Sequence, residues 1–156
     1  MDAERTRAFL LQLPHVVETM QWGNNLVFWV GDKAIGGKMF ALLNLEGDGR
    51  AILSFSAGPE SFGELVERDG IIPAPYMARI FWVAAERWDV FRPAEWQLHL
   101  THAHQLTLSK LPPRTRAVLA LPAREQKPLI AERRRLIAER RKLLADRKLA
   151  KASRPI

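Results

Sequence analysis

The chain has no cysteine, and this absence excludes several kinds of chemistry at once. Without thiols there are no disulfides, no thiolate-bound metals and no cysteine nucleophile, so the four histidines and the carboxylates are the remaining candidate ligands. No apolar run reaches the roughly 18 residues that suggest a membrane span. The first five residues also lack the basic and then apolar layout of a signal peptide. We therefore expect a cytoplasmic protein with no membrane partner.

The positive charge of the chain is concentrated near its end. From residue 124 onward there are twelve Lys or Arg and four acids, a net charge of +8, whereas the whole chain carries +7. The preceding segment therefore has a net charge of −1. Because 156 residues with 47% hydrophobic content suit one globular core, we predict a domain over residues 1–123 and a basic tail over residues 124–156.

The first half of the domain predicts one helix and four strands. Asp2 is a suitable cap for a helix that stops before Pro14. Runs rich in β-branched and aromatic residues follow, and the short turn-forming segments between them require antiparallel neighbours. The runs are residues 16–22, 26–30, 35–45 and 51–55, separated by Gly23-Asn24, Gly31-Asp32 and Glu46-Gly47-Asp48-Gly49.

The second half predicts two more helices and one more strand. Pro59 begins a helix that ends near Gly70, residues 71–76 are extended, and residues 79–84 form a buried strand. Pro93 begins a helix that ends at Pro112. This order is typical of an α+β fold with two layers, in which helices pack on one face of a mostly antiparallel sheet.

Six short motifs, in their order and spacing, resemble the MmcQ/YjbR family over roughly residues 9–116. The resemblance implies a small domain with an antiparallel sheet, likened to secretion chaperones, and a DNA-binding role proposed from a double-wing shape. The motifs are Leu13-Pro14, Glu18-Thr19, Gly37-Lys38-Met39-Phe40-Ala41, Gly70-Ile71-Ile72-Pro73-Ala74-Pro75-Tyr76-Met77, Phe81-Trp82-Val83 and Ser109-Lys110-Leu111-Pro112.

The chain departs from the family pattern at two places. Ser54-Phe55-Ser56 stands where relatives often carry a lysine, and Ala103 precedes His104 where relatives often have a serine. Both changes remove polar groups. If the family's binding surface uses that lysine, this member binds differently.

The tail predicts a helix with a seven-residue repeat, over residues 129–135, 136–142 and 143–149. Its apolar residues are adjacent, which does not match the three-and-four spacing of a coiled coil. We expect the helix to dock Leu129, Leu136 and Leu143 on its own domain, a second subunit or a polyanion, or else to fray.

No pattern in the chain indicates an enzyme, a cofactor or a metal. Gly36-Gly37-Lys38 lacks the spacing of a phosphate-binding loop and is better interpreted as a turn before a strand. No Gly-x-Ser-x-Gly segment occurs. Glu95, His99 and His102 share a helix face but have no visible fourth ligand, so we interpret them as a solvated flank. We expect His104 to pack partly buried.

Five tryptophans are available for packing or for stacking on bases. Trp29, Trp82 and Trp96 lie within apolar patterns, and we expect them to be buried. Trp22 and Trp88 lie beside turns and are the candidates for an exposed role.

The leading hypothesis is a non-enzymatic binding protein whose tail contacts DNA or RNA phosphates. One alternative is a protein-interaction or homodimerisation module in which the tail helix closes a dimer. Another places a small molecule near Lys38, Tyr76 and Trp82. The candidate nucleic-acid-binding residues are Arg133, Arg134, Arg135, Arg140, Arg141, Lys142, Arg147, Lys148 and Lys38.

Overall fold

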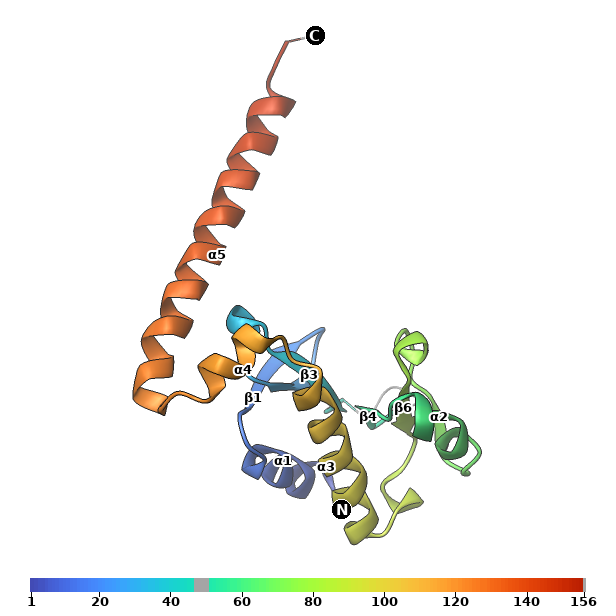
Figure 1. The fold of residues 1–156 in the computed structure, drawn as a ribbon. Coiled ribbons are helices and arrows are strands. Elements are labelled where there is room, and N and C mark those ends of the chain that lie inside the picture. Colours follow the sequence, from blue (N-terminus) through green and yellow to red (C-terminus); the bar gives the residue numbers. More distant parts are fainter. Residues whose placement is uncertain (47–50, 156) are drawn as a thin grey trace.

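The computed structural model describes residues 1–46 and 51–155. They form a six-stranded antiparallel sheet of order β1-β2-β3-β4-β6-β5, with helices around it (Figure 1). The α+β class predicted from the sequence is confirmed. The strands are β1 (Val16–Gln21), β2 (Asn25–Val30), β3 (Lys38–Asn44), β4 (Leu53–Ser56), β5 (Ile71–Pro73) and β6 (Trp82–Ala85). The helices are α1 (Ala3–Gln12), α2 (Pro59–Val66), α3 (Pro93–Ser109), α4 (Pro113–Leu119) and α5 (Ala123–Ala152), with the 3₁₀ turns η1 (Lys33–Ile35), η2 (Ala78–Ile80) and η3 (Trp88–Val90).

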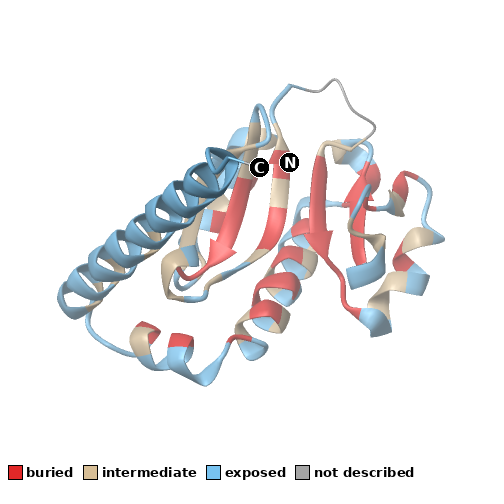
Figure 2. Cartoon of the chain, turned by 90° about the horizontal axis from the view of Figure 1, so that it is seen from above, coloured by how far each residue is buried: buried red, intermediate tan, exposed pale blue. Residues whose placement is uncertain are grey.

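The hydrophobic core lies between one face of the sheet and α1, α2 and α3 (Figure 2). Phe28 and Phe55 on strands and Trp96 on α3 are among its fully buried side chains. His104, which was predicted to be partly buried, is almost fully buried on α3, and its Nε2 lies 2.7 Å from the Pro14 carbonyl oxygen. The other face of the sheet has no covering layer of these helices, and we call it the open face.

The predicted starts of the first three helices are confirmed, whereas α2 ends at Val66, before the predicted stop near Gly70. The Asp2 carboxylate accepts a hydrogen bond of 2.8 Å from the Arg5 N–H, which caps α1. Pro93 occupies the first turn of α3, where a missing N–H costs nothing.

Two predicted strands begin later than expected. Residues 33–35 form η1, and Gly36 follows in the left-handed region with φ of 91°, so β3 begins only at Lys38. Residues 78–80 form η2, and Phe81 follows with φ of 61°, so β6 begins at Trp82. The extended segment after Gly70 pairs with β6 as β5, which the sequence did not predict. The predicted turn at residues 46–49 falls largely outside the described residues.

The unpredicted helix α4 connects the body to the tail. The Thr115 hydroxyl donates a 2.7 Å hydrogen bond to the Ile35 carbonyl oxygen, which ties α4 to η1. A Cβ atom at Gly36 would lie 2.4 Å from the Thr115 hydroxyl oxygen, so this close approach requires glycine. Leu119 is the last buried residue of the described chain, and α5 then extends away from the body (Figure 1).

Candidate nucleic-acid interface

Helix α5 carries most of the predicted phosphate-binding residues and is exposed along most of its length. Gln126, Ile130 and Ile137 are its partly buried residues, and α5 contacts the body at η1. Leu129, Leu136 and Leu143 are 42%, 39% and 59% exposed, so they do not dock on the body, and docking on a second subunit or a polyanion stays a prediction. The reason is rotation: adjacent residues lie about 100° apart around a helix, so turning the isoleucines inward turns the leucines away.

Two of the predicted arginines are already engaged. Arg134 pairs with the Asp32 carboxylate, which also accepts a 2.8 Å bond from the Ala34 N–H. Arg135 bridges Glu132 at 2.7 Å and Glu139 at 2.6 Å, and its hydrogen bond holds the pKa of Glu132 below its usual value. Within residues 1–46 and 51–155, the other predicted cations of α5 form no ion pair: Arg133, Arg140, Arg141, Lys142, Arg147 and Lys148.

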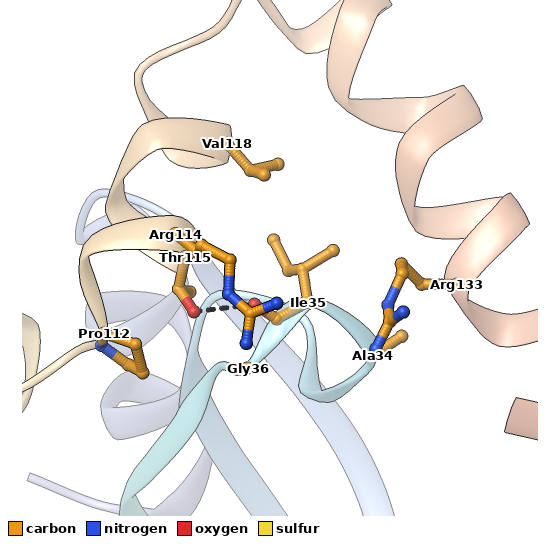
Figure 3. Close-up of a pocket in the computed structure, with 8 residues that line it drawn as sticks. All are labelled: Ala34, Ile35, Gly36, Pro112, Arg114, Thr115, Val118 and Arg133. Carbon is orange, nitrogen blue, oxygen red and sulfur yellow. Dashed lines mark hydrogen bonds between the residues drawn. The ribbon is translucent and has the colours of Figure 1, made fainter.

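A first hollow of about 270 Å³ lies where α4 and α5 flank η1. Arg114 from α4 and Arg133 from α5 line it, and Figure 3 shows Ile35 between them. Two exposed guanidinium groups thus border one cavity. Each guanidinium presents N–H donors in a planar fork that matches phosphate oxygens.

A second hollow of about 450 Å³ lies between α5 and the open face of β1 and β2. Lys33, Arg134 and Arg141 line it beside the Trp29 indole, and the Lys33 Nζ is 5.7 Å from the centroid of that ring. We call the surface formed by Lys33, Arg114, Arg133, Arg134 and Arg141 the η1 crossing.

The YjbR family model matches residues 11–106, which is more than half of the chain. This chain belongs to the YjbR family. Its fold is similar to the crystal structure of Deinococcus radiodurans protein DR2400, described with the domain DUF419. That likeness has a TM-score of 0.65 and 26% identity, and it covers 76% of this chain and 88% of the other. No curated protein matches the chain. Because the family match stops at residue 106, α4 and α5 lie beyond it.

The sequence did not identify two cations of the η1 crossing in this YjbR-family protein. Lys33 follows the predicted Gly31-Asp32 turn. Arg114 follows Pro113, and a proline is typical of the first position of a helix, so it could have indicated the start of α4. The predicted residue Lys38 is exposed at the start of β3 and lines neither hollow.

The predicted solvated flank of α3 is wrong for His99. Its ring is half-buried between Phe55 and Phe91, with centroids 6.2 and 4.5 Å away, and this burial lowers the pKa of His99. Glu95 instead pairs with Arg68 at 2.9 Å. Among the described residues, no three His, Asp or Glu side chains are placed to share a metal ion. None of the described helices has the length and apolar character needed to cross a bilayer.

The tryptophans divide nearly as predicted. Trp29, Trp82 and Trp96 are buried, and Trp22 is 64% exposed. Trp88 is a correction, because it is half-buried with its ring 5.5 Å from that of Trp96. Of the residues in the small-molecule hypothesis, Tyr76 borders a groove on the open face and Trp82 is buried in the apolar cluster of that face, whereas Lys38 does not line the groove.

Proposed function

We propose that this YjbR-family protein is a non-enzymatic nucleic-acid-binding protein that holds phosphates on the η1 crossing and along α5. The observation that supports the proposal is the convergence of cations from three elements: Lys33 of η1, Arg114 of α4 and Arg133 of α5 border adjoining hollows. Asp32, the acid that lines the second hollow, is already paired with Arg134.

The distribution of charge favours the tail as the segment that attracts a polyanion. A segment of net charge −1 provides little long-range attraction to a polyanion, whereas residues 124–156 carry +8. Contacts of this kind fix the position of the phosphate backbone and do not read base sequence. Binding through α5 is therefore expected to be weak, with a dissociation constant of about 10⁻⁵ M at physiological salt, and largely independent of sequence.

The salt dependence of binding tests this proposal. If about five cations neutralise duplex phosphates, the logarithm of affinity falls against the logarithm of salt with a slope near −4.5, from roughly −0.9 per contact. Replacing the four outer cations Arg140, Lys142, Arg147 and Lys148 by glutamine flattens that slope by roughly 0.9 for each of them that contacts a phosphate. Fluorescence anisotropy with a labelled random duplex measures both slopes.

A matched control uses the arginines that are already paired. Arg134→Gln with Arg135→Gln removes two charges whose partners are Asp32, Glu132 and Glu139, so the slope changes by less than with two outer cations. If a chain that ends at residue 122 binds duplex as tightly as the full chain, α5 is not the binding element.

Homodimerisation is a second candidate, favoured by the exposed stripe of Leu129, Leu136 and Leu143. The seven-residue repeat places Glu132 and Glu139 on one flank of this stripe and Arg133 and Arg140 on the other. In a parallel two-fold pair, the acidic flank of one helix faces the basic flank of its partner.

Molar mass in solution separates this candidate from a monomeric binder. Sedimentation equilibrium that reports twice 17.8 kDa, and a single-chain mass for Leu136→Lys, would support the dimer. A single-chain mass for the unchanged protein at about 100 μM would exclude it as a stable assembly.

A further inference from the structure

The open face carries an apolar groove of about 640 Å³ that is separate from both hollows of the η1 crossing. Met39 and Leu42 of β3 line it, together with Asn25, Asn44, Trp22 and Tyr76. Its volume lies in the range of cavities that hold small organic groups. None of the residues that line it is charged among those the structure describes. The groove therefore suits an uncharged apolar group with polar edges.

Two exposed aromatic rings border this groove. Trp22 follows β1 and Tyr76 follows β5, which are the two edge strands of the sheet, yet both line the same cavity. Trp22 is 64% exposed and Tyr76 is fully exposed. Their φ angles of 49° and 64° lie in the left-handed region, which is costly for bulky side chains. Two large exposed rings thus follow from a backbone conformation that is itself unfavourable for their residue types.

The polar groups of the groove have fixed positions. Asn25 and Asn44 are cross-strand partners on the open face. The Asn25 amide donates a 2.6 Å hydrogen bond to the Trp22 carbonyl oxygen, which secures the turn that carries the indole. Amide groups beside apolar walls can bond to the edge of a planar ring that stacks between aromatic side chains.

The groove adjoins the η1 crossing on the same face. Met39, which lines the groove, is the cross-strand partner of Trp29, and Trp29 lines the hollow that contains Lys33 and Arg141. An apolar, aromatic site thus lies one strand away from a cationic one. This pairing is complementary to a polymer that alternates planar uncharged rings with anions.

We propose that the groove is a stacking site for unpaired bases of a single-stranded nucleic acid whose phosphates lie on the η1 crossing. This inference rests on the proposed function and narrows its ligand from nucleic acid in general to single strands. In a duplex the bases are stacked inside the helix and do not reach Trp22 or Tyr76.

Two probes separate base contacts from phosphate contacts. The first is a labelled oligothymidine strand of about 12 nucleotides, a length within the site sizes of single-strand binders, and the second is an abasic strand of equal length. Both carry the same phosphates, and the first alone carries bases. At equal salt we expect the full-length protein to bind the thymidine strand at least about tenfold more tightly.

The variants remove each ring without disturbing its turn. Asparagine tolerates the left-handed region, so Trp22→Asn and Tyr76→Asn keep the backbone while removing the stacking surface. Each is expected to weaken binding of the thymidine strand by roughly 5- to 150-fold and to leave the abasic strand unaffected. Trp22→Phe retains a ring and much of the affinity. Leu98→Asn, at a 67% exposed position on α3, is the matched control and changes neither affinity.

The outcomes separate this inference from the proposed function. Equal affinity for the two strands, with no effect of Trp22→Asn, overturns the stacking site while phosphate binding stands. Loss of affinity on removal of the rings, but not on replacement of the α5 cations, overturns the proposed role of α5 and supports the groove. Failure to bind either strand or duplex overturns both.

Discussion

The body and α5 of this protein are stabilised in different ways. Every buried residue of the described chain lies at or before Leu119, whereas α5 has none over 30 residues. The body is held by a core that joins distant segments, and α5 depends on helix-forming residues, local ion pairs and its contact with η1. The region with the highest net charge contributes least to the core. Substitutions in α5 are therefore expected to test the proposed binding without unfolding the body.

The largest expected difference is between Trp96 and Leu136. Trp96→Ala removes a fully buried ring and its 2.9 Å hydrogen bond to the Trp88 carbonyl oxygen, which lowers the free energy of unfolding by about 3–5 kcal/mol. Leu136→Ala lies on the exposed side of α5 and changes it by less than about 0.5 kcal/mol. Urea unfolding measures both. Similar losses would mean that α5 is part of the core.

A smaller loss of folding stability is expected for a substitution at the junction of the body and α5. Gly36→Ala combines a φ of 91° with a Cβ atom 2.4 Å from the Thr115 hydroxyl oxygen, and we expect a loss of about 1–2 kcal/mol. Gly23→Ala is the matched control, because φ is 82° there but nothing lies within 4 Å of the added atom. It measures backbone strain alone. Equal losses in thermal melts would show that the Thr115 contact relaxes freely.

Removal of α5 is expected to lower the free energy of unfolding by still less. A chain that ends at Pro122 loses the ion pair between Arg134 and Asp32 and two Gln126 hydrogen bonds, together worth about 1 kcal/mol because the arginine is mostly exposed. Calorimetry is expected to show one cooperative transition for the shortened protein. An aggregated or non-cooperative product would contradict the predicted domain over residues 1–123.

The smallest expected effect is on the stability of the body at acidic pH. Because burial lowers the pKa of His99, the folded protein binds that proton less readily than the unfolded chain. The contribution of neutral His99 to the free energy of unfolding is therefore complete above about pH 6.5, and it is lost as the pH falls below that value. The difference in melting temperature between pH 7.5 and pH 5.5 should be smaller in His99→Gln than in the unchanged protein. His102→Gln, at an exposed position on the same helix, should retain the original difference.

Much of the fold could be predicted because the chain marks its element ends clearly. Asp2 and Pro93 begin helices where caps and proline require, and the short turns make β1, β2 and β3 antiparallel neighbours. The start of β3 could not be predicted, since a single turn of 3₁₀ helix at Lys33–Ile35 has no periodicity of its own.

The site was harder to predict because it depends on which face of a regular helix meets the body. Leu129 and Ile130 recur with the same seven-residue period, so the sequence alone does not select the docking stripe. The choice follows from Asp32 and η1, which receive Arg134 and thereby set the rotation of α5. Arg114 joins Arg133 only through tertiary contact, which no local pattern indicates.

The length of α5 has a hydrodynamic consequence. At 1.5 Å per residue its 30 residues span about 45 Å, whereas a domain of about a hundred residues has a radius of gyration near 13 Å. A rod that extends beyond a sphere raises the frictional coefficient, so a single chain elutes early in gel filtration and tumbles anisotropically. A retention volume calibrated with globular standards therefore overstates the mass of a single chain and does not by itself distinguish a monomer from a dimer.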